Sequence, residues 1–161
     1  MIDPQDAAAI AALQQASYAK ARGVKSSWPE ADALNAEAIA YFLGRRRYCV
    51  LASARPDRRP HAAPVAYVVA GGNFWFASVE GLRLRNLRAT PWAALVVMEN
   101  EPDHVALTAE GPLTIHEGDA FEAAFEPLRD RWLRRHEQAP DWAVALIELR
   151  PEMVFSYAAS S

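Results

Sequence analysis

Cysteine is almost absent from this chain, since Cys49 is the only one among 161 residues. One cysteine cannot form an intrachain disulfide, which excludes a secreted scaffold stabilised by disulfide bonds. Because free cysteine is among the most often buried residues, we expect Cys49 to be buried and unreactive. Lysine is also scarce, with Lys20 and Lys25 as the only two, so arginine carries nearly all of the positive charge. The net charge of -3 provides no overall attraction to nucleic acid, and no nucleic-acid partner is expected.

Long apolar runs are absent as well, because no stretch approaches the roughly 18 residues that a membrane-spanning helix requires. The N-terminus is acidic and lacks the basic region of an export signal, so we expect a cytoplasmic protein with no membrane contact. The chain has no GxGxxG, P-loop, CxxC or HExxH motif, and nucleotide hydrolysis and zinc chemistry therefore lose most of their support. Its four histidines are too scattered to predict a metal site.

The sequence does contain enough apolar residues for one ordinary globular domain. Hydrophobic residues make up 52% and charged residues 23%, which excludes a disordered chain, and the length fits a single domain over residues 1–161. The first part, residues 1–34, is predicted to be a helical extension, with an alanine-rich helix over residues 4–22 followed by a connector. A second helix is predicted to begin at the N-cap Asn35 and to end at Gly44.

From Tyr48 onward the apolar pattern changes to the short runs and turn residues that are typical of β-strands. Pro64 falls inside the second run and predicts a sheet edge or a bulge, because proline cannot donate a ladder hydrogen bond. Strands are predicted over residues 48–54, 61–69, 74–78, 93–98 and 104–116, the last interrupted at Gly111-Pro112, and over 142–157 as a pair or as one strand bent at Pro151. Turns are predicted at 55–60, 71–73 and 99–103, and one amphipathic helix over 119–136.

A short arginine-rich helix is predicted within residues 81–91, between the third and fourth strands. Its leucines would anchor it, while Arg83, Arg85 and Arg88 project outward. Arginine binds phosphate through two parallel hydrogen bonds, and the hydroxyl of Ser78 can add a donor. A solvated helix face is the alternative, and the spacing alone leaves both open. The order of elements predicts a small β-barrel with this helix at its rim, which is a seat for a phosphate-bearing cofactor.

Several short segments carry a resemblance to a known family. They are VLAS at 50–53, DRRPH at 57–61, PV at 64–65, RLRNL at 83–87 and Pro91, in that order along the chain. Together they resemble the pyridoxamine 5'-phosphate oxidase-like family of flavin-binding split barrels over about residues 38–116, with a weaker match at 147–151. The resemblance implies a mainly β, Greek-key split barrel with peripheral α-helices, which forms a homodimer and holds FMN in a groove at the dimer interface.

The same resemblance assigns cofactor-binding residues by position. Ser53 would face the isoalloxazine ring, neighbouring contacts would come from His61, Pro64 and Val65, and the phosphate would be held by Ser78, Arg83 and Asn86. Arg83 stands where the family often has lysine, and the arginine run 45–47 would add contacts to the phosphate. No catalytic residue is assigned, because hydride chemistry belongs to the cofactor. A true pyridoxamine phosphate oxidase needs further substrate-phosphate ligands and a longer C-terminal set of strands than this chain has.

The function expected from the resemblance is that of an FMN-dependent oxidoreductase, which transfers hydride to or from a small organic substrate. The deazaflavin coenzyme F-420 is an alternative cofactor, because the positive charge of Arg55, Arg58 and Arg59 would attract its longer acidic tail. A second alternative is a flavin- or haem-binding module without turnover, in which His61 or His104 would be the axial ligand of a haem. The sequence does not identify the substrate.

Overall fold

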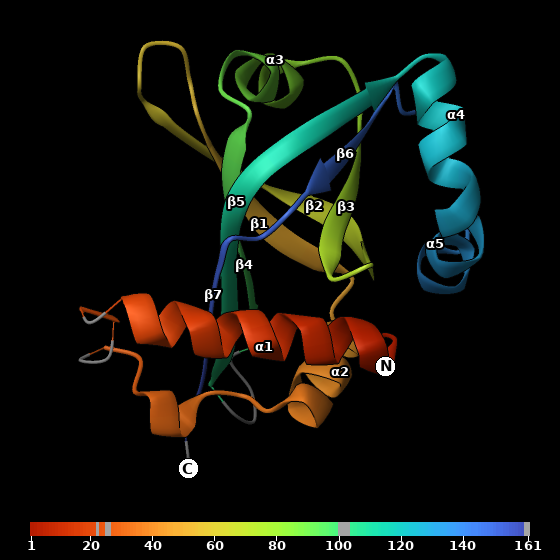
Figure 1. Ribbon diagram of the computed structural model, residues 1–161. Helices are drawn as coiled ribbons and strands as arrows, with labels where there is room; N and C mark the ends of the chain where they lie inside the picture. Colours follow the sequence, from red (N-terminus) through yellow and green to blue (C-terminus); the bar gives the residue numbers. More distant parts are fainter. Residues whose placement is uncertain (22, 25–26, 100–103, 160–161) are drawn as a thin grey trace.

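The computed structural model describes residues 1–21, 23–24, 27–99 and 104–159. Within these ranges, six antiparallel strands follow one another in the order β4-β1-β2-β3-β6-β5, and the pairing of β4 with β5 closes them into a barrel (Figure 1). The strands are β1 (Tyr48–Ala54), β2 (Pro60–Ala70), β3 (Asn73–Ser78), β4 (Trp92–Glu99), β5 (Val105–Glu117) and β6 (Ala145–Leu149), and β7 (Met153–Ala158) pairs with β5 outside the ring. The predicted split barrel with peripheral helices is confirmed, and its helices hold roughly as many residues as its strands.

The connection between β3 and β4 makes this barrel a Greek key. Strands β1, β2 and β3 form a meander, and β4 then pairs with β1 rather than with β3. The resulting spatial order 4-1-2-3 is that of a Greek key, as predicted. In the described structure, residues 60–66 of β2 pair only with β1, and β3 pairs with β2 from Tyr67 onward. Pro64 therefore lies on a free edge, which confirms the prediction made from its missing N–H.

Strand β5 is long enough to pair with two neighbours in turn. Its first half pairs with β7 as far as Glu110, and its second half pairs with β6 from Leu113 onward. At Gly111, between the two halves, a Cβ atom would lie 2.1 Å from the carbonyl oxygen of Arg150, so only glycine fits. The predicted interruption is thus a change of partner within one continuous strand. Within residues 142–157, β6 and β7 do not pair with each other but follow one another along the same edge of β5, with a break at residues 150–152, so one strand bent at Pro151 is the better of the two predicted alternatives.

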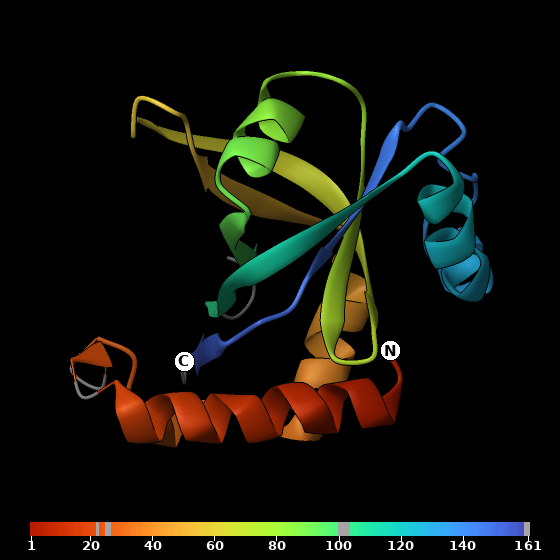
Figure 2. The ribbon, with the colours of Figure 1, turned by 45° about the horizontal axis from the view of Figure 1, so that its top comes forward.

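Helices cover the two ends of the barrel (Figure 1, Figure 2). Helix α3 (Leu82–Ala89) lies at one end, whereas α1 (Pro4–Lys20), the short 3-10 helix η2 (Glu30–Asp32) and α2 (Ala36–Arg45) lie at the other. The Asn35 side chain accepts a hydrogen bond from the backbone N–H of Ala38 at 2.9 Å, which confirms the predicted N-cap of α2. This capping bond begins the helix that carries the chain into β1.

Two predictions reach beyond the part of the chain that the structure describes. Arg22, the predicted end of the first helix, lies outside the described residues, and so do residues 100–103 of the predicted turn at 99–103. Among the helices that are described, none is both long and apolar enough to cross a membrane.

Buried polar side chains fix α1 on β7. Ser156 Oγ donates a hydrogen bond to Gln14 Oε1 and accepts one from the backbone N–H of Leu34 at 2.8 Å. Gln14 Nε2 in turn donates to the carbonyl oxygen of Leu34 at 2.8 Å, and Ser17 Oγ accepts from the N–H of Val154 at 3.0 Å. These bonds satisfy polar groups that burial removes from water, and they set the position of α1 along the sheet.

The prediction of one continuous helix over 119–136 is wrong. The structure has α4 (Asp119–Phe125), the 3-10 turn η3 (Glu126–Leu128) and α5 (Arg129–His136). Pro127 explains the break, because proline has no N–H to donate and its ring clashes with the preceding turn of an α-helix. The predicted apolar face is nevertheless present, since the buried side chains of Phe125, Leu128 and Trp132 pack against Val68 and Leu146 on the outside of the barrel.

Apolar side chains from all the barrel strands fill its interior. They include Leu51, Tyr67, Phe74, Phe76, Val97, Leu107 and Ile147. Leu84 and Leu87 of α3 join the same cluster and are fully buried. Their burial holds α3 firmly across the end of the barrel, which positions the polar residues of this helix.

Candidate functional site

Helix α3 carries its polar residues on two different sides. Leu84 and Leu87 are buried as predicted, whereas Leu82, Arg85 and Arg88 are exposed. Arg83 differs from the other two arginines, because its side chain is partly buried and reaches the end of β3. Asn86 is fully buried on the same side of the helix. The helix therefore presents one arginine and one amide to the barrel rather than three arginines to water.

Two serines on the barrel meet these α3 side chains. Arg83 Nε donates to Ser78 Oγ at 3.4 Å, and Asn86 Nδ2 donates to Ser53 Oγ at 3.4 Å. Both serines are buried, and the Ser78 hydroxyl donates in addition to the carbonyl oxygen of Val79 at 3.0 Å. The structure thus brings together four of the predicted site residues from β1, β3 and α3.

His61 lies beside this group. It is directly opposite Ser53 in the antiparallel pairing of β1 with β2, so the two side chains point to the same face of the sheet. Three buried polar atoms in and next to this group lack a hydrogen-bond partner within the described structure, namely His61 Nδ1, Asn86 Oδ1 and Arg55 Nε. Unsatisfied buried polar atoms are costly and uncommon in folded proteins. Their concentration around Ser53 is the pattern of a site that a ligand completes.

The charge of Arg83 is not balanced by the protein. Across the described ranges it forms no ion pair, and burial lowers the pKa of its guanidinium below the usual value. Arg88, on the same helix, contacts Glu80 at 2.8 Å and Glu117 at 2.5 Å, and these carboxylates raise its pKa. A partly buried cation without a counter-charge is unfavourable, so the Arg83 position favours an incoming anion.

Pro64 and Val65 lie apart from this cluster. Val65 is opposite Cys49 in the barrel core, where burial raises the pKa of the Cys49 thiol to about 12. Cys49 is therefore buried, as predicted, and its thiol is protonated at neutral pH. Pro64 is exposed and lies opposite Val50 on the outer face of the sheet, so it points away from Ser53.

The other predicted arginines have partners of their own or lie in the hairpin. Arg47 pairs with Glu137 at 3.1 Å, Arg46 pairs with Glu99, and Arg45 donates to the Tyr41 hydroxyl, all around the junction of α2 and β1. In the β1–β2 hairpin, Arg59 pairs with Asp57 at 2.7 Å, and Arg55 and Arg58 form no ion pair within the described residues. The run 45–47 thus begins at the end of α2, which covers the end of the barrel away from α3 (Figure 1).

An apolar groove on the outer face of the sheet was not predicted. It has a volume of about 430 Å³ and is lined by residues of β1, β4, β5 and β7, including Val50, Ala52, Val96, Met153 and Phe155. Glu110 is the one ionisable residue among the described residues of this lining. The signal in the sequence was the continuous apolar run at 93–98, which is typical of a strand covered on both faces.

A model of the pyridoxamine 5'-phosphate oxidase family matches residues 36–158, from the first turn of α2 to the end of β7. The chain belongs to this family. The match confirms the resemblance seen in the sequence and leaves the N-terminal helix α1 outside it. No curated protein sequence matches the chain. Within the described residues, no group of three histidine, cysteine or acidic side chains is placed to hold a metal ion.

Solved structures of low sequence identity share the fold of this family member. The conserved hypothetical protein Rv2991 from Mycobacterium tuberculosis has a TM-score of 0.65 at 22% identity, covering 80% of this chain and 88% of its own. A pyridoxamine 5'-phosphate oxidase-related, FMN-binding protein from Nostoc punctiforme has a TM-score of 0.58 at 19% identity, with coverages of 74% and 82%. The heme storage protein HutZ from Vibrio cholerae has a TM-score of 0.56 at 20% identity, with coverages of 74% and 92%.

Proposed function

We propose that this protein binds FMN beside α3 and transfers hydride between the flavin and a small organic substrate. The observation that carries the proposal is the unbalanced charge of Arg83 next to the hydroxyl of Ser78. A phosphate group would supply the missing counter-charge, and the guanidinium fork matches phosphate oxygens in two parallel hydrogen bonds. The FMN-binding structural neighbour and the family to which the chain belongs support flavin as the carrier of that phosphate.

The residues around Arg83 fit the rest of such a cofactor. No side chain of the described residues caps the N-terminus of α3, so its first amide groups and the positive end of its dipole are available to the phosphate. Asn86 Oδ1 and His61 Nδ1 are two of the three buried atoms here that lack partners within the described structure, and FMN carries hydroxyl and ring N–H groups that would provide them. Arg83, Ser78, Asn86, Ser53 and His61 are thus the residues that would hold FMN.

The flavin ring supplies the hydride chemistry when it is bound. The contribution of the chain is to orient the cofactor and to keep water away from it. Ser53 and Asn86 are buried and joined by a hydrogen bond, so they form a fixed polar surface below α3. Because α3 is anchored by two fully buried leucines, this surface is rigid before any ligand arrives.

The apolar groove on β1, β4, β5 and β7 supports a homodimer as part of the proposal. Next to it, the same face carries exposed apolar side chains, and the first half of β2 has a free edge. Such a surface is unfavourable in water and is typical of an interface. A second copy of the chain would cover it, and Pro64 on the outer face would then lie near the partner rather than near Ser53.

Coenzyme F-420 and haem are the competing ligands. The deazaflavin would use the same Arg83 site and extend its acidic tail toward Arg55 and Arg58, which lack ion-pair partners within the described residues. Haem is favoured by the structural likeness to a heme storage protein and by the unpartnered Nδ1 atom of His61. His104 is exposed just before β5, which makes it a weaker candidate for an axial ligand.

An absorption spectrum of the purified protein, followed by titration with each ligand, tests the proposal. We expect fluorescence quenching of FMN with saturation in the micromolar range or tighter, and weaker binding of coenzyme F-420. Reduction of the bound flavin by a nicotinamide coenzyme or another donor would then establish redox activity. Binding of neither flavin, together with a haem Soret band in the purified protein, would replace the oxidoreductase with the haem module.

A further inference from the structure

A second cavity, of about 440 Å³, lies on the side of the barrel that carries α1 and α2, away from α3. Its walls are the segment before α1, the end of α2 at Gly44, Val68 and Val69 of β2, and α5. The N-terminus, α2 and α5 lie on this side of the barrel in Figure 1. The cavity is lined by three arginines of α5, which are Arg131, Arg134 and Arg135.

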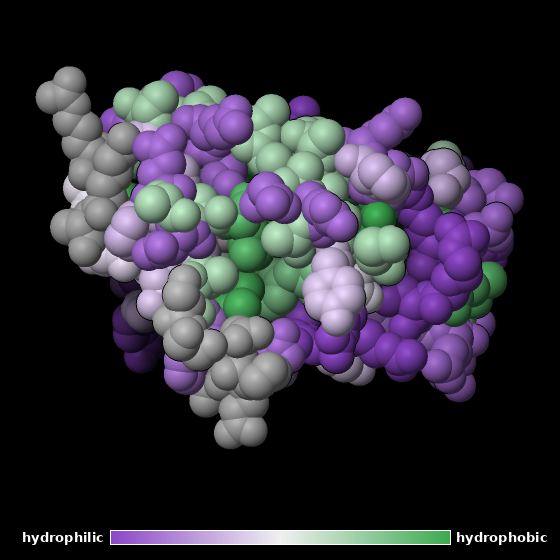
Figure 3. Space-filling view, turned by 90° about the horizontal axis from the view of Figure 1, so that it is seen from below, coloured by the Kyte–Doolittle hydropathy of each residue, from purple (hydrophilic) through white to green (hydrophobic). Residues whose placement is uncertain are grey.

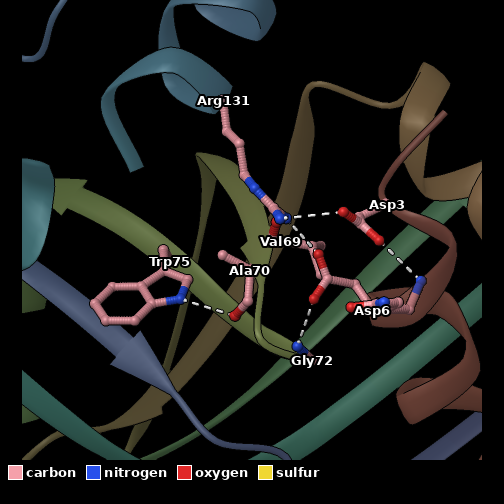
Figure 4. Close-up of polar contacts among 8 residues, drawn as sticks. Asp3, Asp6, Val69, Ala70, Gly72, Trp75 and Arg131 are labelled. Atoms are coloured by element: carbon pink, nitrogen blue, oxygen red, sulfur yellow. Dashed lines mark hydrogen bonds and ion pairs between the residues drawn. The ribbon is translucent and has the colours of Figure 1, made fainter. Parts of the chain in front are cut away.

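Arg131 is the one arginine of the three whose charge is neutralised. Its guanidinium donates to the carboxylate of Asp6 and to the carbonyl oxygen of Val69, the latter at 2.9 Å, and it lies 3.4 Å from Asp3 Oδ2 (Figure 4). Asp6 is buried and also accepts from the N–H of Gly72 at 3.0 Å. Two carboxylates therefore surround this guanidinium and hold it in place as a fixed wall of the cavity.

Arg135 is held by neutral groups of the described structure rather than by carboxylates. Its guanidinium donates to the carbonyl oxygens of Leu43 at 2.6 Å, of Gly44 at 3.4 Å and of Arg46, and it stacks 4.6 Å from the centre of the Tyr67 ring. Carbonyl groups at a helix C-terminus attract a cation but do not cancel its charge. Arg135 forms no ion pair with any carboxylate among the described residues, and its buried Nε has no partner there.

Arg134 is the third arginine of the cavity, and its guanidinium is available to a ligand. It is exposed at the cavity and forms no hydrogen bond or ion pair within the part of the chain that the structure describes. Strongly hydrophilic side chains gather on the α5 side of this face in Figure 3. Among the described residues, the three guanidinium groups pair with two carboxylates, those of Asp3 and Asp6, so an excess positive charge remains.

We propose that this cavity binds a small dianion, either a phosphate monoester or a dicarboxylate, at a site separate from that of Arg83. Its volume lies in the range of about 300 to 1,000 Å³ that is common for small-molecule sites. Arg134 supplies an open guanidinium fork, Arg135 supplies a partly buried charge that no carboxylate of the described residues balances, and the valines of β2 supply an apolar floor. Because Arg131 is already fixed by its carboxylates, its side chain does not have to become ordered when the ligand binds.

Titration of the full-length protein with inorganic phosphate or succinate, at constant ionic strength, tests the proposal by ¹⁵N-¹H correlation spectra. We expect saturable shifts of the α5 amides around residues 131–135 with at least one of the two ligands, and the tighter one identifies the class. Arg134→Gln should weaken binding about tenfold, as expected for a charge-assisted pair, and Arg134→Glu should abolish it. Neither variant should unfold the protein, because Arg134 has no partner in the described structure to lose.

Two further variants separate this site from general electrostatics and from the proposed flavin site. Arg150→Gln removes an exposed arginine outside the cavity and should bind as the wild type does. Arg83→Gln should leave the α5 shifts unchanged. The proposal is overturned if neither ligand shifts the α5 amides, if Arg134→Gln binds like Arg150→Gln, or if Arg83→Gln removes the response of α5.

Discussion

Replacing Arg83 with alanine is the sharpest test of the proposed cofactor site. The variant removes one guanidinium from a partly buried position where no carboxylate of the described residues opposes it. A charge-assisted hydrogen bond contributes about 1.5 to 3 kcal/mol. We therefore expect Arg83→Ala to bind FMN about 10- to 150-fold more weakly than the wild type does.

The stability of the ligand-free variant provides an independent check of the same reasoning. The one hydrogen bond that Arg83 makes within the described structure is a long contact of 3.4 Å with Ser78, so little stabilisation is lost. Burial lowers the pKa of the Arg83 guanidinium, which means that the folded state disfavours its charge. We expect the free energy of unfolding of Arg83→Ala to equal or exceed that of the wild type when no cofactor is bound.

Fluorescence titration with FMN and with riboflavin measures the effect and separates its causes. Riboflavin lacks the phosphate, so Arg83→Ala should change its affinity by less than about twofold. Arg85→Ala is the matched control, because Arg85 is on the same helix but is exposed. Equal weakening of FMN and riboflavin would show that Arg83 acts through the structure of α3. An equal effect of Arg85→Ala would show that only the general positive charge of the helix matters.

Three further predictions concern the fold. Gly111→Ala should lower the free energy of unfolding by about 2 kcal/mol or more in urea, since its Cβ would meet the Arg150 carbonyl, whereas Gly81→Ala has open space and should cost much less. Burial lowers the pKa of His136, so the unfolded state binds its proton more readily and the free energy of unfolding should fall as pH drops below about 6.5. His136→Asn should reduce this dependence of the free energy of unfolding on pH. The Cys49 thiol, with a pKa of about 12, should resist Ellman's reagent at pH 8 until the protein unfolds, and fast labelling of the native state would contradict its burial.

Local signals in the sequence were sufficient to predict most of the elements of the barrel. The hairpin of β1 and β2 followed from alternating apolar runs around a turn, and the start of α2 followed from the capping side chain of Asn35. The sequence also contained a signal for the break at Pro127 that the prediction did not use, because proline inside a helical pattern ends or bends the helix. The closure of β4 on β5 was not predictable in this way, because it depends on contacts between distant segments, and the apolar run at 93–98 indicated only that β4 is covered on both faces, not that β1, β5 and β7 complete the groove.

The candidate site was also predicted only in part, because some of its contacts follow from helical spacing and others depend on how distant segments pack. Arg83 precedes Asn86 and Leu87 by one helical turn, so helical spacing places all three on one side, whereas Arg85 and Arg88 point away. Sequence spacing therefore contained the distinction between Arg83 and its neighbours. The bond from Asn86 to Ser53 and the unsatisfied atom of His61 depend on how α3 sits on the barrel, which no local pattern specifies.

Counter-charge, rather than the number of arginines, distinguishes the arginines that join elements of this fold from those that we propose to bind ligands. Arg88 lies between two carboxylates and ties α3 to the end of β5, and Arg131 lies between two others and ties α5 to the start of α1. Arg83 and Arg134 have no such partners within the described residues, and Arg135 has only carbonyl groups. Folding around an unbalanced cation costs free energy that the core must offset, whereas an anionic ligand that binds there contributes the missing attraction. Arg83 lies on a different side of the barrel from Arg134 and Arg135, so ligands at α3 and at α5 should each stabilise the fold without competing for one site.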